Sequence, residues 1–160
     1  MWQLKNNYER MKQVIGRKEK ISLPKWGLKL VAAKIDTGAY TSAIHSDFAQ
    51  EETDDMGNKV LTFTVLPTHH KKYTGEILRT TDYTTKKVKN SFGQAEDRFK
   101  IMTRVILFGE EFEAEFTLSD RTNMRNSILL GRKILKGKFV VDVDLTFQSQ
   151  KSAKTNPKRL

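Results

Sequence analysis

Most of the sequence consists of short runs rich in β-branched and aromatic residues, and each run ends at Gly, Pro, Asn or Asp. This pattern is typical of strands joined by turns. From Phe112 to Leu118, for example, apolar residues alternate with polar ones, as in a strand with one buried face. Helical periodicity is scarce, and room for helical turns is found mainly at residues 132–136. The pattern therefore predicts a mostly-β fold, barrel-like, with one or two short helices.

The strands can be placed along a single domain. We expect them at residues 14–23, 28–35, 59–66, 98–108, 112–118, 127–130 and 139–143, with one or two more within 75–89. A chain of 160 residues is long enough for one domain with a core and too short for two ordinary ones. We therefore predict an N-terminal arm at residues 1–13, a β domain at residues 14–146, and a basic, flexible tail at residues 147–160.

The chain is strongly basic, with 29 Lys and Arg against 19 Asp and Glu and a formal charge of +10. Such a surface attracts nucleic acid, anionic lipid or acidic proteins. No known nucleic-acid-binding motif is present, and aromatic residues are not interleaved with the basic ones as a stacking platform requires. The excess charge therefore indicates a solvated basic surface, and we expect no specific nucleic-acid partner.

Several features bear on the compartment. No apolar run approaches the length that spans a bilayer, and the start, MWQLKNNYERMKQV, lacks the apolar core of a signal peptide. The chain has no cysteine, so neither disulfides nor thiolate chemistry are available. We therefore expect a cytoplasmic protein with no membrane span.

The tripeptide Asp36-Thr37-Gly38 directly follows the apolar run at residues 28–35. Alone it is weak evidence, because Asp and Gly are common turn residues and average usage gives this tripeptide in about one chain in thirty of this length. Ala39 follows it, however, and a second apolar element that ends in glycine, Ile128-Leu129-Leu130-Gly131-Arg132, lies downstream. The two segments together make the tripeptide informative.

Four segments, AKIDTGAYTSAIHS, VKNSFGQAEDRF, LSDRTNMRNSILLGRKIL and FVVDVD, resemble the retropepsin-like aspartic proteases. The resemblance runs from Val14 to Asp144 and is closer to the bacterial group named ATP-dependent zinc proteases, often encoded beside RimK-type glutamate ligases. It implies a closed β-barrel of the acid-protease type, in which the Asp-Thr-Gly-Ala loop lies under a later strand ending in two apolar residues and Gly. It also implies an aspartic peptidase that acts on peptide or protein substrates.

Peptide hydrolysis by carboxylates uses two of them side by side, sharing one proton because like charges that close cannot both ionise cheaply. One takes a proton from a bound water while the other donates to the substrate carbonyl. This chain holds a single Asp-Thr-Gly and no Asp-Ser-Gly. The expected enzyme is therefore a homodimer in which Asp36 of each chain faces its twin across a two-fold axis.

The resemblance also implies roles for the neighbours of Asp36. Thr37 is sized to hydrogen-bond across the two-fold axis and hold the paired loops together. Gly38 lets backbone N–H groups approach the carboxylate without a side chain in the way. Ala39 completes the loop, and the apolar side chains of Ile128 to Leu130 are expected to pack against it.

Arg132 departs from the viral pattern. In compact viral retropepsins the corresponding Arg pairs with an acidic residue just after Asp-Thr-Gly-Ala. Here those positions hold Tyr40 and Thr41, so that ion pair is missing. Asp142 or Asp120 could take its place as partner. We therefore expect the dimer contact to differ from the viral one.

A turn predicted at residues 90–93 offers a candidate flap. Ser91, Phe92 and Gly93, or the strand ends beside them, would close over the substrate. A plain hairpin turn is an equal alternative for this segment.

Neither a metal site nor a cofactor is expected. Zinc hydrolases present paired His on a helix, as in H-E-x-x-H, whereas His69 and His70 are adjacent and would face opposite sides of a strand. His45 is interpreted first as a structural hydrogen-bonding residue. The chain also lacks the nucleotide motif G-x-x-x-x-G-K-[ST] and the serine-nucleophile motif G-x-S-x-G.

Two functions of different class therefore stand. The first is a homodimeric aspartic endopeptidase, which the intact Asp-Thr-Gly favours. The second is a non-catalytic β-barrel that binds a peptide or an acidic partner, which the missing partner of Arg132 favours, because a fold alone does not determine function. A zinc-dependent peptidase is a weaker third possibility, and loss of activity on chelation is its test.

Overall fold

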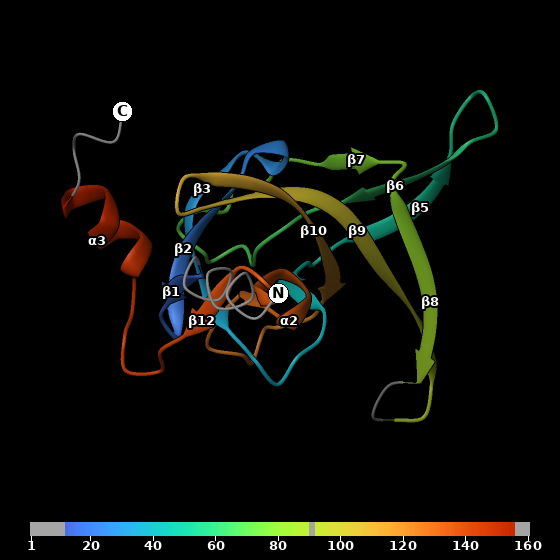
Figure 1. The fold of residues 1–160 in the computed structure, drawn as a ribbon. Coiled ribbons are helices and arrows are strands. Elements are labelled where there is room, and N and C mark those ends of the chain that lie inside the picture. The colour runs from blue at the N-terminus through green and yellow to red at the C-terminus, as the bar shows by residue number, and fades with distance from the viewer. Residues whose placement is uncertain (1–11, 90–91, 156–160) are drawn as a thin grey trace, which may run out of the picture.

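The computed structural model describes residues 12–89 and 92–155, which form mainly strands (Figure 1). The helices are α2 (Arg132–Leu135) and α3 (Gln148–Thr155), and a 3-10 turn, η1, covers Pro24–Trp26. The strands are β1 (Gln13–Ile15), β2 (Lys18–Leu23), β3 (Leu28–Ile35), β4 (Ser42–His45), β5 (Ala49–Thr53), β6 (Lys59–Phe63), β7 (Leu78–Thr80), β8 (Tyr83–Lys89), β9 (Ala95–Leu107), β10 (Glu110–Ser119), β11 (Ile128–Leu130) and β12 (Phe139–Val141). The predicted mostly-β class is confirmed.

Six strands close into a barrel in the order β10-β4-β11-β3-β2-β9, because β9 also pairs with β10. Most neighbours are antiparallel, but β10 pairs with β4, and β11 with β3, in parallel. Strand β8 pairs with the first part of β9, and the resulting hairpin projects from the barrel in Figure 1. Closure confirms the retropepsin-like barrel that the resemblance implied.

Strand β3 has the predicted bounds, and its buried side chains include Val31, Ala33 and Ile35. On its far side it meets β11, where Leu130 lies opposite Ile35. Strand β11 is antiparallel to β4 along its other edge, and its three residues are all buried. The barrel therefore brings the residues after β3 against a strand about ninety positions later in the sequence.

A second sheet, in the order β5-β6-β7, packs against the barrel through aromatic contacts. Trp26 of η1 meets Phe63 of β6 edge-on at 5.6 Å and Phe116 of β10 at 5.9 Å between ring centroids. Edge contacts of this kind add about 1 kcal/mol each beyond the burial of the rings. Trp26 thus joins the two sheets into one core.

Besides shifts at strand ends, the structure differs from the prediction in the first strand and in two further strands. The strand expected at residues 14–23 is divided into β1 and β2. Between them the main chain passes so close to Leu145 that a Cβ on Gly16 would lie 2.5 Å from the Leu145 carbonyl oxygen. Strand β1 instead pairs in parallel with β12. Strands β4 and β5 were not predicted. Four of the five residues of β5 are exposed, and its conformation comes from pairing with β6 rather than from a buried face of its own.

Residues 148–155 were expected to belong to a flexible tail but form the helix α3. Its start is fixed by Glu19, a fully buried carboxylate of β2. Glu19 accepts hydrogen bonds from the main-chain N–H groups of Gly16, Gln148 and Ser149 at 2.8 to 3.0 Å. The N–H groups of Gln148 and Ser149 are donors that a helix start leaves unsatisfied. The predicted N-terminal arm, apart from residues 12 and 13, lies outside the described residues.

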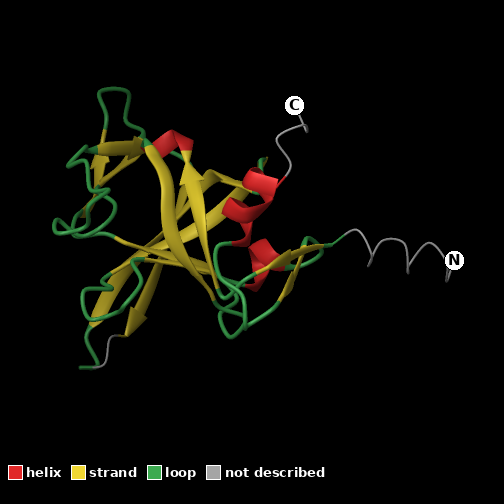
Figure 2. Ribbon diagram, turned by 90° about the vertical axis from the view of Figure 1, so that its left-hand side faces the viewer, coloured by secondary structure: helices red, strands yellow, loops and turns green. Residues whose placement is uncertain are grey.

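The two α-helices lie on the same side of the barrel, away from the β8–β9 hairpin (Figure 2). They contain four and eight residues. Within residues 12–89 and 92–155, no helix has the length and apolar character needed to cross a bilayer.

Candidate active site

Asp36 begins a tight loop at the end of β3. Its N–H donates to the carbonyl oxygen of Leu130 at 2.9 Å, which continues the pairing of β3 with β11. The chain then turns back, and the N–H of Gly38 donates to Asp36 Oδ1 at 2.9 Å. A Cβ on Gly38 would lie 3.1 Å from that same oxygen, so glycine leaves room for the close approach. The loop itself therefore orients the carboxylate, as expected for Gly38.

The far side of the loop is held by the first residues of α2. The N–H groups of Arg132 and Lys133 donate to the carbonyl oxygens of Ala39 and Tyr40 at 2.8 and 3.0 Å. Helix N–H groups at this position have no partner within their own helix, so they are free to bind the loop. At Gly131 a Cβ would come within 2.8 Å of both carbonyl oxygens. The glycine between β11 and α2 is thus required for this contact.

The side chain of Arg132 also serves the loop. Its Nη1 donates to the carbonyl oxygen of Thr37 at 2.8 Å, and its guanidinium lies 5.8 Å from the ring centre of Tyr40. The two carboxylates considered as replacement partners, Asp120 and Asp142, instead accept hydrogen bonds within their own turns. Arg132 therefore stabilises the loop through a carbonyl and an aromatic ring where the viral enzymes use an ion pair.

Asp36 and its neighbours differ in exposure. Asp36 is half-buried, Thr37 and Gly38 are exposed, and Ala39 is half-buried. Beneath them, Ile128, Leu129 and Leu130 are at most 8% exposed. The structure thus brings the predicted loop together with its predicted apolar wall, and it leaves the Thr-Gly edge of the loop accessible.

Residues 14–152 match the profile of the RimB-like family, described as retropepsin-like aspartic endopeptidase RimB. The chain belongs to this family. The match covers the whole barrel and the start of α3.

Curated relatives of this RimB-like chain carry a different name. A "Probable alpha-L-glutamate ligase" of Desulfotalea psychrophila is 33% identical over 131 residues, which is 82% of this chain and 28% of the relative. One of the same name from Shewanella pealeana is 31% identical over 142 residues, 85% of this chain and 30% of the relative. The RimB-like chain therefore spans less than a third of the length of these two relatives.

A solved structure has the same fold. It is the crystal structure of a Legionella pneumophila protein of unknown function, assigned to DUF785. The TM-score is 0.67 at 27% sequence identity, and the match covers 85% of this chain and 97% of the other.

The candidate flap is the turn that joins β8 to β9. Phe92 is 87% exposed there, and Gly93 has a positive φ of 76°. Ser91 lies outside the described residues. At the other end of the hairpin, the hydroxyl of Tyr83 donates to Glu51 of β5 at 2.7 Å. The flap role of the turn stays a prediction.

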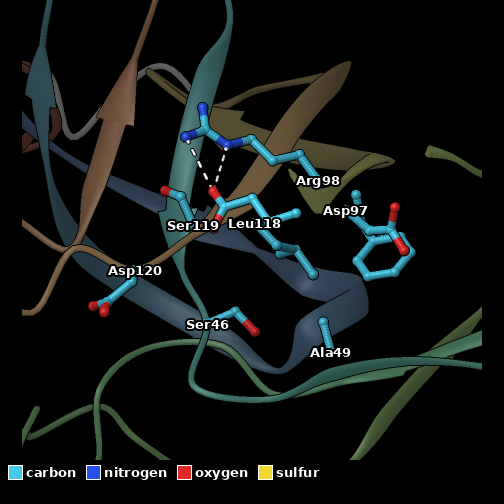
Figure 3. Close-up of a pocket in the computed structure, with 9 residues that line it drawn as sticks. Ser46, Ala49, Asp97, Arg98, Leu118, Ser119 and Asp120 are labelled. Carbon is cyan, nitrogen blue, oxygen red and sulfur yellow. Dashed lines mark hydrogen bonds and ion pairs between the residues drawn. The ribbon is translucent and has the colours of Figure 1, made fainter. Parts of the chain in front are cut away.

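A pocket of about 280 Å³ lies beside the hairpin (Figure 3). It is bounded by the first residues of β9, the end of β10 and the segment that follows β4. Arg98 on its wall pairs with Glu96 at 3.4 Å, as the dashed lines show. Ser119 and Asp120 form the part of the wall nearest in sequence to the connection between β10 and β11. The pocket therefore adjoins that connection and the hairpin.

Sequence reasoning gave no role to Arg121, which begins that connection. Burial of its guanidinium lowers the pKa of Arg121, and the Asp36 carboxylate partly opposes this shift. Its N–H donates to Nδ1 of His45 at 2.8 Å. The resemblance included the segment LSDRTNMRNS, but no spacing rule connects Arg121 with residues 36 and 45.

The histidines can be placed individually. His45 is 1% exposed and hydrogen-bonded, as its structural interpretation predicted. His70 accepts the N–H of Lys72 through Nδ1, and its pKa is lowered, chiefly by burial. His69 is exposed. Among the described residues, no three His, Asp or Glu side chains gather as metal ligands do.

Proposed function

We propose that this chain is one subunit of a homodimeric aspartic endopeptidase whose catalytic pair is Asp36 from each subunit. The observation that carries the proposal is the Asp36 loop of a RimB-like chain, oriented by Gly38 and clamped between β11 and α2. The chain contributes a single such loop. The second carboxylate has to come from another copy, and a two-fold contact through the exposed Thr37 and Gly38 supplies it.

In this dimer the two carboxylates lie within hydrogen-bond distance and hold one proton between them. The ionised carboxylate takes a proton from a bound water as the water oxygen attacks the peptide carbonyl carbon. The protonated carboxylate gives its proton to the carbonyl oxygen. The carboxyl group that took the water proton then gives it to the departing nitrogen, and the C–N bond breaks as a hydroxyl of the tetrahedral intermediate returns its proton to the other carboxylate. One peptide and one water become one carboxylic acid and one amine.

Glutamate-containing peptides are the substrate class that we propose. The curated relatives named alpha-L-glutamate ligases are more than three times as long as the segment they share with this chain, so the two activities would occur in one polypeptide. The net charge of +10 favours an acidic substrate. Exposed Lys86, Lys87 and Lys89 lie along β8, on the hairpin that carries the candidate flap.

The test is Asp36→Asn, measured with fluorogenic peptides that contain glutamate. Asn cannot hold or transfer the catalytic proton, so we expect kcat to fall by at least about a thousandfold with thermal unfolding unchanged. The matched control is Asp55→Asn, an exposed carboxylate in the turn between β5 and β6. It should cleave at the parent rate, and EDTA should leave that rate unchanged.

The outcomes separate the functions. If Asp36→Asn cleaves as well as the parent, Asp36 is not the catalytic residue and the peptidase proposal fails. A parent protein that binds acidic peptides without cleaving them would support the binding module. Loss of activity with EDTA alone would support the zinc-dependent peptidase.

A further inference from the structure

Arg121 lies at the start of the connection between β10 and β11, and both its main chain and its side chain are fixed. The main-chain N–H donates to Nδ1 of His45 at 2.8 Å. The side-chain Nε donates to the carbonyl oxygen of Asn126 at 3.0 Å, across the same connection. The guanidinium is therefore held in one place, which is unusual for a long, cationic side chain on a loop.

His45 provides the anchor for this arrangement. Because Nδ1 accepts the N–H of Arg121, the imidazole proton has to be on Nε2. Nε2 is 2.6 Å from Oδ1 of Asp47, which accepts a hydrogen bond from the Nε2–H group and fixes the orientation of the ring. The ring is 1% exposed, whereas the Asp47 side chain is 45% exposed, so the contact joins a buried imidazole to a carboxylate at the surface. His45 thus ties the Arg121 connection to β4, the strand that follows the Asp36 loop.

The guanidinium keeps binding capacity after these contacts. Within residues 12–89 and 92–155, the Arg121 side chain makes one hydrogen bond, from Nε to Asn126. Its two Nη groups have no acceptor in this part of the chain. The connection continues from Asn126, the acceptor of Nε, into the three-residue strand β11, and the carbonyl oxygen of Leu130 at the other end of β11 accepts the N–H of Asp36. The guanidinium is therefore one short strand away from the Asp36 loop. The neighbouring Asp120 carboxylate accepts from Thr122 instead. A half-buried arginine whose Nη groups lack acceptors is suited to bind a carboxylate, because two parallel N–H groups can donate to its two oxygens.

We infer that Arg121 binds a carboxylate of the substrate next to the scissile bond, and that His45 and Asp47 are positioning residues for it. The inference rests on the proposed peptidase function and names the part of the site that would recognise glutamate. Ser119 and Asp120, immediately before Arg121, line the pocket in Figure 3. The carboxylates of Glu96, Asp97 and Asp120 also line it, so an acidic side chain would bind at Arg121 rather than inside the pocket.

The test compares two fluorogenic peptides that differ only in Glu or Gln on either side of the cleaved bond. For Arg121→Gln we expect kcat/KM on the Glu peptide to fall by about 30-fold, mostly through KM, and to change less than about threefold on the Gln peptide. Arg121→Lys should lose less kcat/KM on the Glu peptide than Arg121→Gln does, because Lys keeps the positive charge but lacks the paired N–H donors of the guanidinium. Arg125→Gln removes the same charge from an exposed position on the same connection and should change neither peptide.

Equal losses on both peptides, or no loss on either, would overturn the role of Arg121. For His45→Asn the readout is the ratio of kcat/KM between the two peptides, which a smaller folded fraction cannot change. We expect this ratio to fall toward that of Arg121→Gln. An unchanged ratio would remove His45 and Asp47 from the scheme.

A binding measurement separates this inference from the proposed function. Fluorescein-labelled Glu and Gln peptides are titrated with Asp36→Asn protein, with and without Arg121→Gln, and fluorescence polarisation is recorded. Selective loss of Glu-peptide binding supports Arg121 even if the parent cleaves nothing, in which case the peptidase proposal alone fails. Equal binding of both peptides by Asp36→Asn would overturn the Arg121 inference while leaving catalysis to its own test.

Discussion

At the scale of single residues, Glu115 joins α2 to the barrel wall. Its carboxylate lies 2.9 Å from Nζ of Lys100 on β9 and 2.7 Å from Nζ of Lys133 on α2. The hydrogen bonds from these two lysines lower the pKa of Glu115 below its ordinary value of 4.5. Since Lys133 also donates its N–H to Tyr40, the contact steadies the helix that clamps the Asp36 loop.

Replacing Glu115 by Gln should therefore destabilise the fold in a pH-dependent way. A lowered folded-state pKa means that the carboxylate contributes its full stability above 4.5, and that this contribution disappears as the pH falls through the folded value. We expect Glu115→Gln to lose about 1 kcal/mol in the free energy of unfolding at neutral pH and almost nothing in strong acid. Urea unfolding at both pH values measures the difference.

The control is Glu113→Gln, two residues earlier on β10, whose side chain is 69% exposed and 3.8 Å from Arg104. This substitution should change the free energy of unfolding very little at either pH. A loss for Glu115→Gln that is the same in acid would show that packing, and not the charge, stabilises this contact.

Single residues also show how far sequence can predict a site. The positions of Gly38 and Gly131 could be predicted, because each lies in a local motif where a Cβ would crowd a neighbouring oxygen. Arg121 could not, because its position depends on a hydrogen bond to His45, 76 residues away in the sequence. The partner of Arg132 was likewise unpredictable, since a carbonyl oxygen and a ring leave no charge pattern in the sequence.

At the scale of elements, we propose the β8–β9 hairpin as the flap. Its base is tied to the second sheet by the Tyr83–Glu51 hydrogen bond, while its turn carries the exposed Phe92. A hairpin fixed at its base and projecting at its tip can move over a bound peptide without disturbing the barrel.

Phe92→Ser tests this role. Loss of the apolar tip should lower kcat/KM by about tenfold through weaker closure over the substrate, with thermal unfolding unchanged. Met56→Ser is matched to it, because Met56 is also 87% exposed and lies in the turn between β5 and β6. Equal kcat/KM for the two variants would leave the β8–β9 turn as a plain hairpin connection.

Elements with a strong pattern of their own were predictable, and elements made by pairing were not. Strand β3 combines an apolar run with turn residues on both sides, and its predicted bounds match the structure. Strand β5, with the sequence AQEET, has no buried face to reveal it. Helix α3 was missed because its start depends on Glu19, a residue about 130 positions earlier.

At the scale of the whole molecule, the proposed function makes the closed barrel one half of a catalytic site. The loop that carries Asp36 is held from below by β11 and α2, while Thr37 and Gly38 remain exposed. One carboxylate cannot serve as both acid and base in the same step. The account therefore depends on a dimer in which each subunit supplies one Asp36.

Mixing parent protein with inactive Asp36→Asn protein tests this claim most directly. After subunit exchange at constant total protein, a shared site requires two parent subunits, so an equal mixture should retain about a quarter of the parent activity. Activity should follow the square of the parent fraction. A linear decline, with about half of the activity in the equal mixture, would show that each chain works alone and would contradict the account.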